Sequence, residues 1–171
     1  LTMRTLPSES NMPEAFSFAF GSCFIPQDFG DDIFADLEKK IITQQSDGSG
    51  LRLFLMIGDN VYVDHYFNEN YKDADLDANE LRQLYREAYR DTWKYENFRR
   101  ALTKIPSCMI FDDHEFWDNW GNVDYDKDEE DHYDKEHYKA AVQAYWEYQD
   151  RHNPDAETRH QGQSPTYYYS F

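Results

Sequence analysis

Side chains that can bind metal ions occur at three places in the chain, each directly after a short apolar run. Cys23 ends the segment Gly-Ser-Cys, and Asp59 and Tyr62 belong to the segment Gly-Asp-Asn-Val-Tyr. The third group, residues 112–115, reads Asp-Asp-His-Glu. Carboxylates packed together repel one another and cannot all stay ionised unless a cation neutralises them. If the three groups converge, a site with more than one metal ion resolves this repulsion.

The apolar runs before these groups predict three buried strands, at residues 16–20, 51–57 and 105–111. Strands separated by helices predict an α/β fold, with a mostly parallel sheet and helices packed on it. In such sheets ligands bind at the carboxyl ends of the strands, so the three groups should meet at one rim. Apolar residues recur at helical spacing in three stretches: Ile33, Phe34, Leu37 and Ile41, with Asp31 and Asp32 as candidate caps; Leu81, Leu84, Tyr85, Ala88 and Tyr89; and Tyr138, Ala141, Val142, Tyr145 and Trp146 after Asp134.

The three groups differ in how strongly each one indicates a site by itself. Cys23 alone is more typical of a small buried apolar residue, and Asp59 alone fits a turn as well as a site. Tyr62 alone indicates nothing. The Asp-Asp-His-Glu group favours function, because its three acids repel one another and its four polar side chains add nothing to a core.

Composition restricts the classes of partner. The chain has 171 residues, enough for one domain, and its 34 acidic and 17 basic residues give a net charge of −17. This charge repels nucleic-acid phosphates and anionic lipids, so no nucleic-acid-binding surface is expected. No apolar run approaches the roughly 20 residues that span a bilayer, and the first 13 residues lack the regions of a signal peptide. Two cysteines, Cys23 and Cys108, could form at most one disulfide and do not define a redox compartment.

The acidic stretch Asp124 to Glu136 is most simply a solvated loop, because its charges repel and it has no apolar periodicity. Its alternating acids mimic the start of an EF-hand calcium loop. However, Glu129 stands where that loop needs glycine and Lys135 where it needs glutamate, so the EF-hand prediction fails.

Two other classes of function explain less of the sequence. A cysteine hydrolase using Cys23 and His114 leaves Tyr62 and the clustered acids without a role, and neighbouring negative charge would raise the pKa of the thiol. An acidic calcium-binding or interaction module without catalysis fits the charge, but it leaves the three strand-end groups unexplained. That module is the alternative to an enzyme.

In their order along the chain, the three groups resemble the motifs of the alkaline phosphatase D (PhoD-like) family of phosphatases and phosphodiesterases. These are Gly-Ser-Cys after a Phe-rich strand, Gly-Asp-x-x-Tyr after the next, and Asp-Asp-His-Glu followed by Asp118, Asn119 and Trp120. The resemblance covers nearly the whole chain. It implies metal-dependent hydrolysis of phosphate mono- or diesters, a metallophosphoesterase-type α/β/β/α sandwich, ferric iron and calcium as metals, and a secreted, periplasmic or cell-surface location.

The resemblance also implies a role for each motif residue. Cys23, Asp59 and Tyr62 would hold the iron, with Asp59 bridging to a second metal that Asp113 also binds. Thiolate, carboxylate and phenolate are anionic donors that suit a ferric ion, although divalent zinc or manganese could occupy such sites. His114 would lie near the scissile phosphate, to stabilise charge or to protonate the leaving oxygen. A metal-bound oxide or hydroxide would attack phosphorus.

The other polar residues of the motifs are expected to support the ligands. Asp112 and Glu115 would orient His114 and the neighbouring backbone. The same supporting role is expected of Asn60, Asp118 and Asn119.

The resemblance divides the chain into two parts. Residues 1–13 would be a linker from an N-terminal β-sandwich domain, and residues 14–171 the N-terminal half of the catalytic domain. The family needs later histidine and aspartate ligands for which this chain has no motif, and Thr166 to Phe171 reads as an interrupted strand. We therefore expect the remaining half of the domain as a partner, and no catalysis by this chain in isolation.

Overall fold

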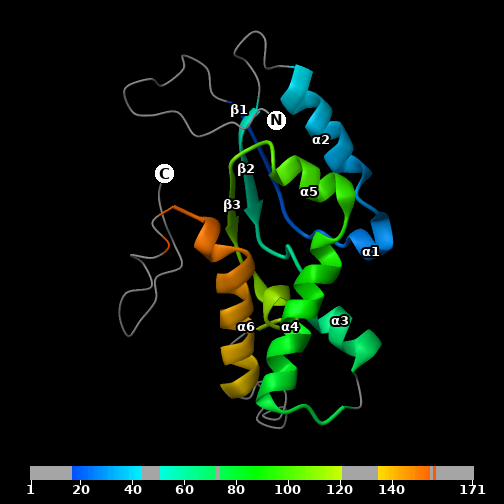
Figure 1. Cartoon of the computed structure of the whole chain (residues 1–171), viewed down its shortest axis with the longest axis vertical. Coiled ribbons are helices and arrows are strands. Elements are labelled where there is room, and N and C mark those ends of the chain that lie inside the picture. Colours follow the sequence, from blue (N-terminus) through cyan, green and yellow to red (C-terminus); the bar gives the residue numbers. More distant parts are fainter. Residues whose placement is uncertain (1–16, 44–50, 72–73, 121–134, 155, 157–171) are drawn as a thin grey trace.

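The computed structural model describes residues 17–43, 51–71, 74–120, 135–154 and 156, and Figure 1 shows how their helices and strands are arranged. The predicted linker, residues 124–134 of the acidic stretch with the Asp134 cap, and the segment Thr166 to Phe171 lie outside the described residues, while Glu136 at the end of that stretch lies in helix α6, Lys135–Tyr148, and not in a loop. The elements follow in this order: β1 Ser17–Gly21, α1 Pro26–Phe29, α2 Asp32–Thr43, β2 Leu51–Ile57, α3 Val63–Asn70, α4 Ala78–Trp93, α5 Glu96–Leu102, β3 Ser107–Ile110, the short turn η2 Asp113–Glu115, α6 Lys135–Tyr148 and the short turn η3 Asp150–His152.

The three strands form a parallel sheet in the order β1-β2-β3. This confirms the predicted α/β class, with a parallel sheet and flanking helices. Gly21, Met56 and Met109 lie level with one another across the sheet. Among the described residues this is one sheet of three strands, so the second sheet of the expected sandwich stays a prediction.

Helices α2 and α5 cover one face of the sheet. Phe34 of α2 packs its ring 4.8 Å from that of Phe98 in α5 and 5.9 Å from that of Phe54 in β2. Met56 and Met109, which point from the sheet into the same cluster, are also buried. This aromatic core fixes the face of the sheet against which the first two crossovers pack.

The inner face of α2 differs from the prediction. Ile33 was expected to face the core but is 73% exposed, whereas Phe34 and Glu38 are buried. Successive helical residues are rotated by about 100°, so a face centred on Phe34 turns Ile33 outward. Glu38 is tolerated inside because Arg100 donates a hydrogen bond to it at 3.0 Å and Lys104 also pairs with it. The side chain of Ile41 lies outside the described residues.

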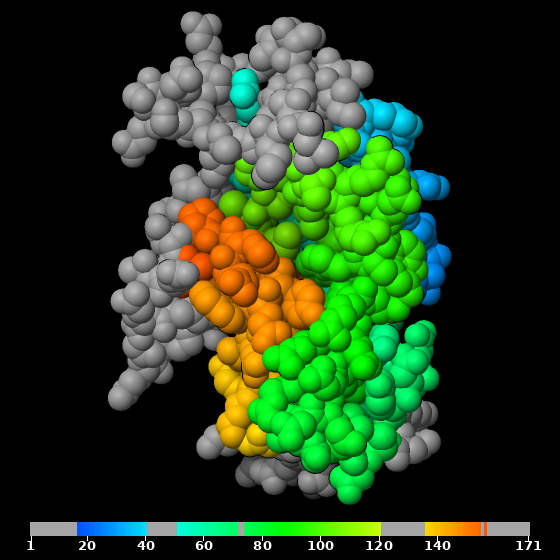
Figure 2. All heavy atoms as spheres, in the orientation of Figure 1, coloured from blue at the N-terminus to red at the C-terminus, as the bar shows by residue number. Residues whose placement is uncertain are grey.

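Helices α4 and α6 pack side by side beyond the carboxyl ends of the strands (Figure 1). In Figure 2 the C-terminal part of α6, in orange, lies directly against α4, in green. All five apolar residues predicted for the inner face of α4 are buried. On α6 the residues that face α4 include Ala140, Ala141 and Ala144, whose small side chains let the helices approach closely.

The prediction for the inner face of α6 is wrong at one residue, Tyr138. Tyr138 is 44% exposed, and its ring stacks 5.9 Å from that of Trp120 at the side of the helix. Tyr145 is fully buried as expected. No helix in the described part of the chain combines the length and the apolar character that crossing a membrane requires.

The other face of the sheet carries exposed apolar side chains. Phe18, Phe20 and Ile57 are 51%, 68% and 47% exposed. Such side chains favour contact with a further layer of protein.

Candidate metal centre

The sheet brings the three predicted groups together. Because Gly21, Met56 and Met109 are level, the loops that follow their strands leave the sheet at the same height. The first two loops are joined directly, since the backbone N–H of Cys23 donates to the carbonyl of Gly58 at 3.3 Å. Cys23 also has a positive φ of 59°, a left-handed conformation that is uncommon outside glycine and that turns the chain sharply at the sheet edge.

Asp59 lies at the centre of the site. Its Oδ2 accepts hydrogen bonds from the Cys23 thiol at 3.3 Å and from the Tyr62 hydroxyl at 3.4 Å. Its Oδ1 is buried and has no hydrogen-bond partner among the described residues. A buried carboxylate oxygen without a partner is costly, and a bound cation would remove that cost.

Tyr62 is affected by the same arrangement. Burial, the hydrogen bond with Cys23 and the charge of Asp59 raise the pKa of its hydroxyl above the ordinary value. Without a cation the phenol therefore stays protonated, and only a metal ion next to it would stabilise the phenolate.

Asp113 and His114 approach Asp59 from the third loop. One oxygen each of Asp59 and Asp113 and a ring nitrogen of His114 lie within 4.8 Å of one another. Asp113 is held in place by the backbone N–H of Asn119, which donates to its Oδ2 at 2.5 Å. Asn119 has a positive φ of 60°, a left-handed conformation that asparagine adopts more readily than most residues. Asn119 thus holds a candidate ligand through its backbone, and its supporting role at a metal site stays a prediction.

The ring of His114 contacts a carboxylate that the sequence analysis did not select. Its Nδ1 lies 3.0 Å from both oxygens of Asp64, a buried residue in the first turn of α3. The ring also stacks on that of Tyr62, with centroids 4.1 Å apart. Nε2 is 3.8 Å from Oδ1 of Asp118, which is more than half exposed. Asp64 therefore favours hydrogen on Nδ1. In a neutral ring, Nε2 then carries no hydrogen and can accept a hydrogen bond or bind a metal ion.

The pKa of His114 is raised above its ordinary value. Burial alone would lower it, but the hydrogen bond and charge of Asp64, together with the charges of Asp59 and Asp113, outweigh burial. In the absence of metal ions the ring therefore holds a proton more firmly than a free histidine does.

Glu115 organises the backbone of two loops. It is fully buried and accepts hydrogen bonds from the backbone N–H of Asp59 at 3.1 Å, Asn60 at 2.7 Å and Asp112 at 3.0 Å. Burial, the largest effect, raises its pKa to about 7 although these bonds favour the carboxylate. Asn60, also buried, donates from its side chain to the carbonyl of Ile110 at 2.9 Å. Asn60 and Glu115 thus tie the β2 loop to the end of β3.

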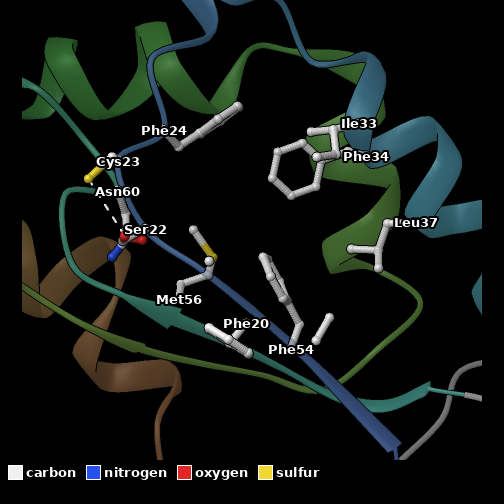
Figure 3. A pocket seen from close by; sticks show the side chains of 12 residues that line it. Phe20, Ser22, Cys23, Phe24, Ile33, Phe34, Leu37, Phe54, Met56 and Asn60 are labelled. Carbon is white, nitrogen blue, oxygen red and sulfur yellow. Dashed lines mark hydrogen bonds between the residues drawn. The ribbon is translucent and has the colours of Figure 1, made fainter.

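An apolar pocket of about 330 Å³ adjoins the site. Figure 3 shows Cys23 and Ser22 at one end of this pocket, with Phe24, Phe34 and Phe54 among the side chains around it. The thiol therefore has an apolar wall on one side and the carboxylate of Asp59 on the other. An apolar wall limits water and strengthens electrostatic interactions beside it.

The residues present fit a metal centre. A thiol, a phenol, a carboxylate and an imidazole converge on Asp59, whose buried Oδ1 has no hydrogen-bond partner in the part of the chain that the structure describes. Asp64 could have been suspected from the sequence, because it follows the Gly-Asp-x-x-Tyr segment by two residues and carboxylates often orient histidines at metal sites.

One of three comparisons with known proteins agrees with the motifs. The family model of the PhoD-like phosphatases matches residues 18–171. This range contains all three groups of candidate ligands and Asp64. A comparison with curated proteins and one with solved structures each found no match.

Proposed function

The chain belongs to the PhoD-like phosphatase family, and we propose that it supplies metal ligands for the hydrolysis of phosphate mono- or diesters. The observation that carries the proposal is the convergence of Cys23, Tyr62, Asp113 and His114 on the carboxylate of Asp59. Family membership indicates a phosphoesterase, and the convergent donors are the groups that such an enzyme needs for binding metal ions.

In this proposal Cys23, Asp59 and Tyr62 hold a ferric ion, and Asp59 and Asp113 hold a second metal, calcium or another divalent ion. The position of Asp59 supports it, because Oδ2 lies against Cys23 and Tyr62 while Oδ1 has no hydrogen-bond partner in the described part of the chain. A carboxylate with both oxygens available can serve two ions. When bound, the metal ions would supply Lewis-acid polarisation of the phosphate and an activated water.

His114 acts on the substrate in this proposal. With Nδ1–H donated to Asp64, its Nε2 is the nitrogen that can donate to a phosphate or leaving-group oxygen. The protonated ring, which Asp64 stabilises through the hydrogen bond at Nδ1, is the form that such donation requires. Asp64 contributes by fixing the ring orientation, and Tyr62 by stacking against it.

The proposal is tested by elemental analysis with mass spectrometry and a visible spectrum. The wild type should contain about one iron per chain and absorb through phenolate-to-iron charge transfer. The absorption should shift or vanish in Tyr62→Phe, and iron should fall in Cys23→Ser. Tyr66→Phe is a matched control, because the Tyr66 hydroxyl contacts Glu87 and not the site.

The opposite result has a definite meaning. Calcium without iron, bound equally by the wild type, Cys23→Ser and Tyr62→Phe, would reject the iron centre. It would favour the acidic binding module instead.

A further inference from the structure

We propose that Gln149, directly after α6, is a positioning residue that sets the spacing between the two ligand-bearing loops after β2 and β3. The inference rests on the metal centre proposed above. Gln149 is fully buried, and it lies 34 positions from Glu115 and 89 from Asn60 in the sequence. It reaches the site only because α6 packs along α4.

The side chain of Gln149 uses its hydrogen-bonding groups on three partners. Nε2 donates to Oε1 of Glu115 at 3.1 Å and to the Tyr89 hydroxyl at 3.0 Å. Oε1 accepts from Nδ2 of Asn60 at 3.1 Å. These partners fix the orientation of the amide, because the reverse orientation would place its oxygen against the carboxylate of Glu115.

Glu115 transmits this contact to both loops. Its Oε2 accepts from the backbone N–H of Asp59 and of Asp112, so one oxygen joins the two loops. Its Oε1 accepts from the backbone of Asn60 and from Gln149, and these bonds fix the rotation of the carboxylate. Without the amide of Gln149, the carboxylate of Glu115 could rotate, and the distance between Asp59 and Asp113 would vary more.

A simple packing role explains the residue less well. An apolar side chain would fill a buried position without the cost of desolvating an amide. An amide that is satisfied on both its nitrogen and its oxygen specifies one arrangement of its neighbours. At this position the neighbours are Glu115 and Asn60, which bind the backbone that carries the ligands.

Asn153 provides a matched control. It is a buried amide from the same C-terminal region, and it bonds to β3 through both the N–H of Met109, at 2.7 Å, and the carbonyl of Met109, at 2.6 Å. A third bond, to Asp150 at 3.1 Å, makes its side-chain contacts equal in number to those of Gln149, but none of the three reaches the ligand loops. Tyr89→Phe is a second control, because it removes a partner of Gln149 that does not touch the loops.

The experiment titrates the wild type, Gln149→Met, Asn153→Leu and Tyr89→Phe with Mn²⁺, counting free ion by electron paramagnetic resonance, and measures urea unfolding of each. Gln149→Met should bind Mn²⁺ about 10- to 100-fold more weakly, as is typical when a residue supporting a ligand is lost. Asn153→Leu should lose stability but keep its affinity within about threefold, and Tyr89→Phe should do the same. If Gln149→Met does not fold, Gln149→Glu keeps the size of the side chain, repels Glu115 and should weaken binding similarly.

The other outcomes are distinguishable. A wild type that binds no Mn²⁺ would overturn the metal centre itself. A wild type that binds, with equal affinity in the Gln149 variants, would overturn only the positioning role. Equal losses of affinity in Gln149→Met and Asn153→Leu would also overturn it, because loss of stability would then explain both.

Discussion

The buried carboxylate of Asp64 pairs with the partly buried ring of His114, whose Nδ1 lies 3.0 Å from each of its oxygens. A carboxylate only accepts hydrogen bonds, so Nδ1 carries the hydrogen. The first turn of α3, which begins immediately after Tyr62, therefore determines which nitrogen of His114 is available to a substrate.

Replacing Asp64 by asparagine should change the tautomer of His114. The new amide can present its N–H₂ group to Nδ1 and so favour hydrogen on Nε2. Nitrogen-15 NMR of the imidazole, at a pH above the raised pKa of the ring, should show hydrogen on Nδ1 in the wild type and a shift toward Nε2 in Asp64→Asn. Asp118→Asn, at the more exposed contact, should leave the tautomer unchanged. Hydrogen retained on Nδ1 in Asp64→Asn would reject the pairing as its cause.

A side chain at Gly58 should destabilise the fold strongly. Gly58 has a φ of +106°, and a Cβ there would lie 2.6 Å from the Cβ of Asp112. The strain and the clash together should cost Gly58→Ala about 3 kcal/mol of unfolding free energy in urea. Gly30→Ala, with a φ of +70° but open space around it, should cost only about 1 kcal/mol. Equal losses at Gly30 and Gly58 would mean that the contact with Asp112 has no effect.

The Arg86–Glu147 pair should give a stability contribution that depends on pH. Arg86 donates to the two carboxylate oxygens at 2.8 and 2.6 Å and joins α4 to α6. The hydrogen bond from Arg86, the largest effect, lowers the pKa of Glu147 from its ordinary value of 4.5. The contribution should thus be complete above pH 4.5 and disappear as the pH falls through the lowered folded value.

The measurement is urea unfolding of the wild type and Glu147→Gln at several pH values. The free energy of unfolding should be about 1 kcal/mol higher in the wild type than in Glu147→Gln at neutral pH, and this difference should become smaller in acid. Asp36→Asn, which breaks an exposed pair with Lys39, should cause no measurable change. A difference that grows as the pH falls would contradict the proposed sign.

Asp31 should stabilise α5 rather than its own helix. It was expected to cap α2, but its carboxylate accepts from the backbone N–H of Asn97 at 2.7 Å and of Phe98 at 3.1 Å, in the first turn of α5. Asp31→Ala should cost about 1–2 kcal/mol and speed hydrogen exchange of the α5 amides. The exposed neighbour Asp32 is the control, since Asp32→Ala should leave exchange in α5 unaffected.

The strands and the meeting of their loops could be predicted because they follow from local patterns. An apolar run such as residues 51–57 predicts a buried strand, and parallel strands end at one edge. Cys23, Asp59 and the Asp-Asp-His-Glu group therefore met as expected. The roles of these residues toward metal ions stay predictions.

The partners that hold the ligands could not be predicted in the same way. Asp64 pairs with a histidine 50 positions away, and Gln149 meets Asn60 only because α6 lies along α4. Glu38 is buried because Arg100 of α5 and Lys104, in the turn after α5, neutralise it. Such contacts depend on how helices dock, which the spacing of residues within one element does not contain.

The level alignment of Gly21, Met56 and Met109 also limits how the length of this chain can vary among natural relatives. Substitutions within β2 can keep Asp59 in place, but a one-residue insertion or deletion there would slip the strand and turn its side chains to the opposite face. The loop that follows β2 would then begin at a different height on the sheet from the loops that follow β1 and β3. Length changes should therefore accumulate in the segments between the helices, while the distance from the middle of each strand to its ligand stays constant.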